Sequence, residues 1–211
     1  MDKRKQVAKI LTRLNREYAG TPQTALTFSS PFELLVATIL SAQTTDVQVN
    51  KVTKILFEKY KTVEDFANTP PEKLAMEIKS VNFFNNKAKN VNRTARMILE
   101  SYDGKVPKTM EELITLPGVA RKTANIVLSS IFGINAGIAV DTHVKRLANR
   151  LGLTKHLDPV KIENDLMPIT PRKDWGHLSH LLIFHGRSIC QARNPKHAEC
   201  VLYDICPSRK S

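Results

Sequence analysis

Apolar residues recur three and four positions apart along most of the chain, which is the spacing of one face of an α-helix. Residues 7–18 and residues 88–99 show this spacing most clearly. Their apolar positions are Val7, Ile10, Leu11, Leu14, Tyr18, Ala88, Val91, Ala95, Ile98 and Leu99. Strict alternation of apolar and polar residues, which is typical of strands, is scarce. The pattern therefore predicts an all-α fold.

Residues that favour helix starts support this prediction. Ser30–Glu33 and Thr109–Glu112 match the capping box, in which a hydroxyl and an acidic side chain each accept a backbone N–H bond of the first turn. Thr62–Asp65 and Thr69–Glu72 indicate two further starts. Other helices are expected near residues 49–56, 124–131, 144–151, 160–166 and 175–185. Composition marks no obvious domain boundary.

Composition narrows the functional classes. The 211 residues carry 32 Lys and Arg against 20 Asp and Glu, a net charge of +12, and 42% of them are hydrophobic. The chain can therefore bury a core, and the charge favours a polyanion: nucleic acid or an anionic membrane surface. The basic residues are spread along the chain, which argues against a membrane-surface helix. From the net charge alone, the alternative stays open that the excess of basic residues has no function.

The three cysteines, Cys190, Cys200 and Cys206, lie in the last tenth of the chain. Their odd number argues against a disulfide framework and favours a reducing compartment. The basic start MDKRKQVAKI has no apolar segment behind it, so we expect no signal peptide. The apolar stretch Leu34–Leu40 is far shorter than the ~20 residues that span a bilayer. We expect a cytoplasmic protein.

Two segments carry candidate chemistry between predicted helices. In Leu116–Ala124, a Pro-Gly turn leads into a helix whose first amides can bind a phosphate; the alternative is an ordinary glycine-capped connection. In the segment Val140-Asp141-Thr142-His143, capping of the following helix is the better interpretation of Asp141 on spacing alone. A carboxylate there can also stay ionised in a partly buried site. His143 by itself is more typical of a structural histidine.

A third segment contains four metal-ligand side chains within seventeen residues. They have the spacing Cys190-x6-His197-x2-Cys200-x5-Cys206. Buried free thiols and a surface histidine are the alternative. The close clustering favours a metal site, for which zinc and iron–sulfur are both chemically reasonable.

Together these segments resemble the endonuclease III family of base-excision DNA glycosylases and lyases, in the helix-hairpin-helix superfamily. The shared segments, in the family's order and spacing, are SSPFELLVATILSAQTTD (29–46), NKAKN (86–90), LPGVARKTAN (116–125), VDTH (140–143), HGRSIC (185–190) and the terminal cysteine cluster. The resemblance implies two helical lobes with a DNA cleft between them. A six-helix domain would cover residues 24–133, and residues 1–23 with 134–211 would form a lobe holding a 4Fe–4S cluster.

The resemblance also implies residue roles. Lys122 matches the nucleophilic lysine and Asp141 the essential aspartate, which would stabilise positive charge on the sugar. Gln43 would fill the space of the extruded nucleotide, and Phe83, more than Phe84 beside it, would wedge into the duplex. The remaining DNA-contacting positions would be Leu116, Gly118, Ala120, Arg121, Thr123, His143, Arg193 and Lys196.

Two positions depart from the family pattern. Ala120 stands where a second glycine is common, which costs stability only if the backbone there needs a positive φ. His197 replaces the second cysteine of the cluster with all spacings kept. The first interpretation is a 4Fe–4S cluster with Cys3His ligation. The alternatives are an altered cluster and a Cys3His zinc site.

The expected function is removal of oxidised pyrimidines from duplex DNA, followed by β-elimination at the abasic site through a lysine Schiff base. Lys122 argues against base-only glycosylases, which lack a lysine there. The alternatives are a mismatch-specific glycosylase of the same superfamily and a non-catalytic, metal-stabilised DNA-binding protein. The expected partner is duplex DNA with damaged bases or abasic sites. We expect a monomer that binds no membrane and, in a prokaryote, associates with the nucleoid.

Overall fold

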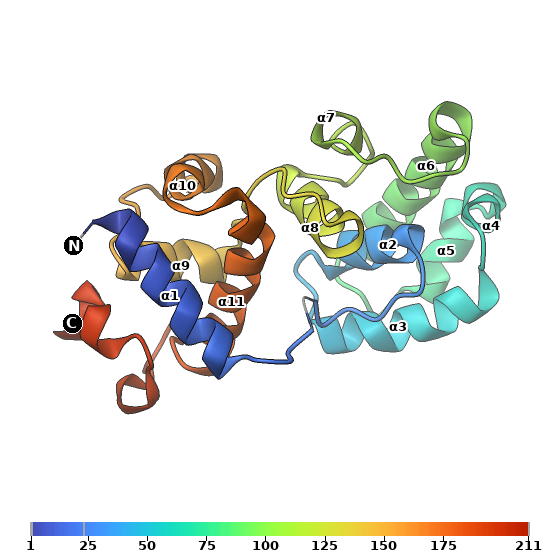
Figure 1. Ribbon diagram of the computed structural model, residues 1–211. Coiled ribbons are helices and arrows are strands. Elements are labelled where there is room, and N and C mark those ends of the chain that lie inside the picture. Colours follow the sequence, from blue (N-terminus) through green and yellow to red (C-terminus); the bar gives the residue numbers. More distant parts are fainter. Residues whose placement is uncertain (1, 23, 211) are drawn as a thin grey trace. The chain divides into compact units, whose positions relative to one another are not determined.

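The computed structural model describes residues 2–22 and 24–210, and over these ranges it contains helices and no strands (Figure 1). The all-α prediction is therefore confirmed. The chain divides into two compact units: Met1–Gln23 with Asn135–Ser211, here called the terminal unit, and Thr24–Ile134, here called the central unit. None of the described helices combines the length and apolar character that crossing a bilayer requires.

The central unit is built around a helix that is apolar on nearly all sides. Its helices are α2 (Pro31–Ser41), α3 (Asp46–Lys59), α4 (Val63–Asn68), α5 (Pro71–Glu77), α6 (Phe84–Tyr102), α7 (Met110–Leu113) and α8 (Arg121–Phe132). In α2, all residues from Leu34 to Leu40 are buried, because α3, α6 and α8 pack against it (Figure 1). A helix that is hydrophobic all round belongs in a core.

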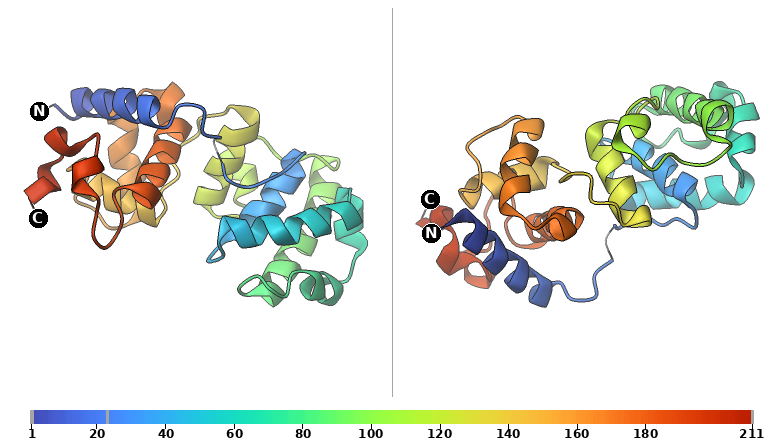
Figure 2. Two further views of the ribbon diagram at one scale, coloured as in Figure 1. Left: turned by 90° about the horizontal axis from the view of Figure 1, so that it is seen from below. Right: turned by 45° about the horizontal axis from the view of Figure 1, so that its top comes forward.

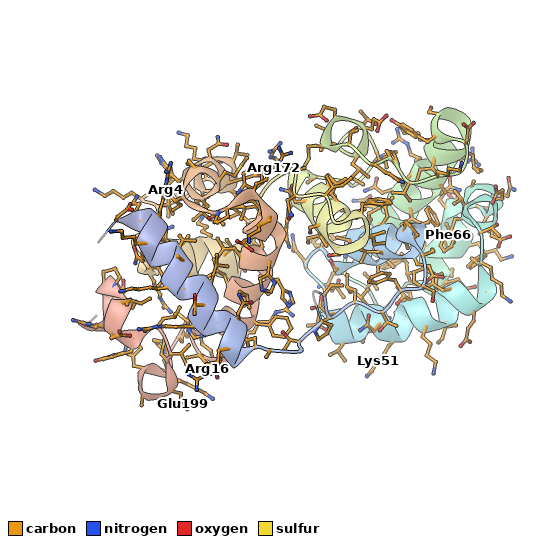
Figure 3. All side chains as sticks on the ribbon, in the orientation of Figure 1. Arg4, Arg16, Lys51, Phe66, Arg172 and Glu199 are labelled. Carbon is orange, nitrogen blue, oxygen red and sulfur yellow. The ribbon has the colours of Figure 1, made fainter. Side chains whose placement is uncertain are left out.

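Aromatic rings hold α4 against this core. Phe66 is 1% exposed, and its ring centroid lies 5.3 Å from that of Phe32 and 5.4 Å from that of Tyr60. Figure 3 shows Phe66 inside the unit, whereas Lys51 extends from the outer side of α3. Tilted and edge-on aromatic contacts of this kind stabilise a core beyond their buried area.

Helices of the central unit begin at predicted hydroxyl caps, but not every predicted capping box is complete. At α4 the capping box is complete: Thr62 Oγ1 accepts from the Asp65 N–H at 3.1 Å, and the Asp65 carboxylate accepts from the Thr62 N–H at 3.0 Å. The predicted box before α2 is half-formed, because the Glu33 carboxylate accepts from the N–H of Ser29.

Two other predicted helix starts also differ from the prediction. Before α7, the Glu112 carboxylate accepts from the hydroxyl of Thr109 and not from its backbone. Helix α5 begins after Pro70, so Thr69 does not cap it. Proline in the first turn explains this start, because its missing N–H has no helical partner there in any case.

The terminal unit joins the two ends of the chain around a second core. Its helices are α1 (Lys3–Glu17), α9 (Thr142–Arg150), α10 (Pro159–Leu166) and α11 (Trp175–Ser188), with the short helical turns η1 (Met167–Ile169), η2 (Arg172–Asp174), η3 (His197–Glu199), η4 (Tyr203–Ile205) and η5 (Pro207–Lys210). Helix α1 lies beside the C-terminal segment (Figure 2), and Arg13 donates to the carbonyl of Val201 at 3.0 Å. Two helical turns earlier in α1, Gln6 donates to the carbonyl of Leu151 at 2.8 Å.

Candidate functional site

A tight turn connects α7 to α8 and exposes the N-terminus of α8. Ala120 occupies the cap position, and its methyl group offers no side-chain hydrogen bond to the first turn. The first amides of α8 and the positive end of its dipole therefore form a phosphate-binding geometry. Ala120 has φ −86°, so its backbone does not require glycine and the replacement is harmless.

Gly118 is the position in this turn where only glycine fits. Its φ is +80°, and an added Cβ would lie 2.9 Å from Asn90 Nδ2 on α6. One helical turn further along α6, Thr94 donates to the carbonyl of Pro117 at 2.9 Å. Helix α6 thus fixes the position of the turn, and the glycine lets the backbone of the turn approach α6 closely.

The side chains of the hairpin point in different directions. Leu116 is 2% exposed, so only its backbone is available to a ligand. Arg121 and Thr123 are half-buried, while Lys122, in the first turn of α8, is exposed. The amine of Lys122 therefore stands beside the anion-binding end of the helix.

In the terminal unit, Asp141 caps α9 as the spacing predicted. Its Oδ1 accepts from the N–H groups of His143 and Val144, both at 2.8 Å. These two bonds fix the carboxylate at the positive end of the helix dipole, where a negative charge is stabilised.

Arg146 links the helix that carries Asp141 to the cysteine-rich segment. Its guanidinium donates to the carbonyl of Cys190 at 3.0 Å and to that of Gly186 at 2.9 Å, and it lies 3.1 Å from His143 Nδ1. Burial lowers the pKa of His143, so its ring is neutral and can accept this bond. A Cβ on Gly186 would come within 3.0 Å of the His143 ring, so glycine allows this close packing.

Gln43 and Phe83 lie in neighbouring segments of the central unit, and both have a left-handed backbone. Their φ angles are +55° and +57°, and such a conformation costs a residue with a side chain about 1–2 kcal/mol. Gln43 is exposed and Phe83 is 61% exposed. Phe84, expected in the same loop, is instead the first residue of α6 and half-buried.

The cysteine-rich segment surrounds a cavity of about 120 Å³ in the terminal unit. The side chains of Cys190, His197, Cys200 and Cys206 all line it, together with Arg150. Among the described residues, no three His, Cys, Asp or Glu side chains converge closely enough to form a single-ion site. The cavity exceeds the ~30 Å³ that one water occupies, so it has room for a group of several atoms.

The polar surroundings of these sulfur atoms suit a bound iron–sulfur group. Arg150 Nη1 lies 3.2 Å from Cys190 Sγ, and His185 Nε2 lies 3.4 Å from Cys200 Sγ. Donors of this kind stabilise the negative charge of coordinating thiolates. Burial raises the pKa of the thiols of Cys200 and Cys206, so a coordinated cation is needed to keep them ionised.

Two basic residues of this segment are open to solvent, and Lys196 also borders the cavity. Arg193 and Lys196 are both exposed, and Lys196 lies 3.6 Å from the carboxylate of Glu199. The segment thus carries exposed positive charge close to the candidate ligands.

Sequence reasoning missed several residues that support the site. Arg150 donates to the carbonyls of Gln191 at 2.7 Å and Ala192 at 3.1 Å, and Tyr18 lies 2.9 Å from His185 Nδ1. The spacing of Arg146 and Arg150, one helical turn apart, was a signal that both face one side of α9. Nothing in the sequence indicated which segment they would contact.

Comparison with known proteins agrees with this combination of hairpin, capped aspartate and cysteine cavity. Residues 36–172 match the model of the HhH-GPD superfamily of base excision DNA repair proteins, and residues 190–206 match the iron–sulfur binding domain of endonuclease III. The chain is therefore a helix-hairpin-helix protein of base excision repair.

The relatives identify its family. The chain is 51% identical to endonuclease III of Synechocystis over 99% of its length and 95% of the relative's, and 43% identical to that of Escherichia coli K12 over 98% and 96%. Its fold resembles that of a trapped covalent intermediate of endonuclease III with DNA, with a TM-score of 0.93, 42% identity, and coverage of 100% of this chain and 98% of the other. The chain belongs to the endonuclease III family, and its cofactor is the family's 4Fe–4S cluster.

Proposed function

We propose that Lys122 and Asp141 carry the DNA glycosylase and abasic-site lyase reactions of this endonuclease III family member, with oxidised pyrimidines in duplex DNA as substrates. The observation that carries the proposal is the position of Lys122. It is exposed, and it lies in the first turn of a helix whose N-terminus has no side-chain cap. A phosphate bound by that helix end holds the neighbouring sugar close to an amine.

The chemistry needs an amine that has lost its proton. Lys122 Nζ attacks C1′ of the damaged nucleotide, and the bond from C1′ to the base breaks with its electron pair leaving on the base. Nζ then loses a proton, and its lone pair forms a C1′=Nζ iminium as the bond from C1′ to O4′ breaks and O4′ takes up a proton. The iminium of the opened sugar acidifies the hydrogen on C2′. Loss of that proton and cleavage of the bond from C3′ to oxygen cut the strand 3′ to the lesion, and water then releases the enzyme.

Asp141 stabilises the positive charge that develops on the sugar and takes part in moving the lysine proton. Its two backbone hydrogen bonds both end on Oδ1, which orients the carboxylate. The carboxylate is therefore held in one orientation at the N-terminus of α9 before the substrate binds.

Extrusion of the damaged nucleotide is the task of the central unit's exposed loops. Gln43 fills the space left in the duplex, and Phe83 wedges between the base pairs to offset the lost stacking. The turn at Gly118 and the half-buried Arg121 and Thr123 hold the backbone near the lesion. His143 in the terminal unit and the exposed residues Arg193 and Lys196 contact further DNA.

The cluster has a mechanical role in this proposal. Cys190, His197, Cys200 and Cys206 hold it, and it supplies a rigid centre for a segment too short to fold unaided. Cleavage of the strand involves no net oxidation or reduction, so it needs no electron transfer from the cluster. We further propose that the protein acts as a monomer in the cytoplasm, on the nucleoid.

Borohydride trapping tests the proposal. Reduction of the iminium links enzyme to DNA, so the wild type should form a stable complex with a duplex containing thymine glycol. Lys122→Ala should abolish it, whereas Lys89→Ala, which removes an exposed lysine of the same unit, should not. Undiminished trapping by Lys122→Ala would overturn the assignment of the nucleophile. Preference for a G·T mismatch over thymine glycol would overturn the substrate class.

A further inference from the structure

A buried lysine sits between the two loops that hold Gln43 and Phe83. Lys87, in the first turns of α6, is only 6% exposed although it carries a charge. Lysine is among the residues least often buried, and it is buried almost only with partners. Neither the fold prediction nor the proposed reaction gives it a role.

The partners of Lys87 belong to the segment that carries Gln43. Its Nζ donates to the carbonyl of Leu40 at 2.7 Å, to that of Ala42 at 2.5 Å and to Thr44 Oγ1 at 3.2 Å. These acceptors lie at and just beyond the C-terminus of α2, where carbonyls lack helical partners and the dipole is negative. One cation thus fixes the residues on both sides of Gln43.

The same lysine contacts the segment that carries Phe83. Its backbone N–H donates to the carbonyl of Phe83 at 3.1 Å, which is the first helical bond of α6 and does not depend on the side chain. Asn82 completes the connection, because its side chain donates to the carbonyl of Gln43 at 2.5 Å and its N–H donates to Thr44 Oγ1 at 3.2 Å. The two segments are therefore joined by bonds that meet at Lys87 and Thr44.

Backbone strain shows why such a connection is needed. Gln43 and Phe83 are two of the four described residues other than glycine that have a positive φ. A strained conformation of this kind persists only where its surroundings over-determine it, and such residues gather at functional sites. Here the surroundings are the three acceptors of the Lys87 amine and the two bonds of Asn82.

We propose that Lys87 is a positioning residue that holds Gln43 and Phe83 as one rigid device for extruding the damaged nucleotide. The proposal rests on the function proposed above for these two residues. It predicts that loss of the Lys87 amine weakens nucleotide extrusion from a duplex and leaves the chemistry of Lys122 intact.

Stability is a poor measure of this role. Burial lowers the pKa of the Lys87 ammonium, so a hydrophobic replacement removes an unfavourable desolvation together with the hydrogen bonds. Lys87→Met keeps most of the side-chain volume and removes all three donors. Lys89→Met makes the same change at an exposed position of α6 and is the matched control.

The experiment compares cleavage of an abasic site in duplex and in single-stranded DNA, because only the duplex requires a plug and a wedge. Lys87→Met should lower the duplex-to-single-strand rate ratio about tenfold, the equivalent of about 1.4 kcal/mol, and Lys89→Met should leave it unchanged. Equal losses on both substrates would show a general structural defect and would overturn the proposal. If Lys87→Met does not fold, Thr44→Val replaces it in the test, because this variant keeps the buried amine and removes one of its acceptors. Thr44→Val should also lower the duplex-to-single-strand rate ratio.

A double-mutant cycle with Gln43→Ala tests whether Lys87 affects the rate ratio by positioning Gln43 or independently of it. If Lys87 acts through Gln43, Lys87→Met should cost much less in the Gln43→Ala background than in the wild type. Fully additive losses would contradict the proposal. Failure of the proposed function has a different signature, namely retained borohydride trapping by Lys122→Ala.

Discussion

Replacing Gly118 by alanine separates two demands that the hairpin makes on this residue. The first is conformational, because its φ is +80°. The second is steric, because the new Cβ would lie 2.9 Å from Asn90 Nδ2 and 3.1 Å from Asn90 Cβ. Gly133 provides a matched control in the same unit: its φ is +64°, and an added Cβ would meet nothing within 4 Å.

The magnitudes follow from these two sites. A left-handed alanine costs about 1–2 kcal/mol, and the reduced freedom of the unfolded chain returns about 0.4–1 kcal/mol. Gly133→Ala should therefore destabilise the protein by about 1 kcal/mol. Overpacking adds about 1–3 kcal/mol, so Gly118→Ala should cost about 2–4 kcal/mol.

Thermal unfolding followed by circular dichroism measures the difference, at about 2–4 °C for each kcal/mol in a chain of this length. Adding Asn90→Ala to Gly118→Ala should restore part of the loss, because it removes Nδ2 and Cγ but leaves the Cβ contact. Binding to DNA with an abasic-site analogue should weaken more in Gly118→Ala than in Gly133→Ala. If Gly118→Ala is no more destabilising than Gly133→Ala, the steric reasoning is wrong.

Three further predictions concern salt, pH and the metal. If six to ten phosphates are neutralised, DNA affinity should fall by roughly 10³–10⁵ between about 50 and 200 mM salt, and a flat salt dependence would contradict an electrostatic interface. Backbone N–H groups of Thr62 and Lys61 lower the pKa of Asp65, so its stabilising effect is present above the ordinary value of 3.8 and is lost as pH falls through the lowered pKa. Asp65→Asn should therefore lower the melting temperature at about pH 7 more than at about pH 2, and an equal effect at both would refute this. The purified protein should absorb in the visible range and contain iron and sulfide, and His197→Cys should lower the reduction potential of the cluster; an unchanged potential would show that His197 is not a ligand.

Local sequence signals predicted the fold because helices depend on neighbours a few residues away. The recurrence of apolar residues three and four positions apart placed α1 and α6, and the hydroxyl residues Ser30, Thr62 and Thr109 marked helix starts that the structure contains. The capping boxes were predicted less well. The acidic side chains of Glu33 and Glu112 each found a different donor within bonding distance, and spacing does not distinguish between such donors.

The candidate site could be predicted only where its residues are close in the sequence. Asp141 was expected to cap α9 and does so. The contacts of Arg150 with the cysteine-rich segment join residues about forty positions apart, and those of Lys87 with the Gln43 segment are similarly distant. No periodicity reports such pairs, because they depend on how helices pack and not on how each one forms.

These long-range contacts give α6 a role that its amphipathic pattern does not reveal. Besides Lys87, Asn92 donates to the carbonyls of Phe66, Ala67 and Thr69, and Thr94 donates to that of Pro117. A buried polar group is costly unless its partners are in place, so each of these side chains specifies the position of one loop. Three segments of the central unit, two of which carry candidate DNA contacts, are thus held by a single helix. Substitutions on the buried face of α6 should therefore alter DNA recognition without contacting DNA.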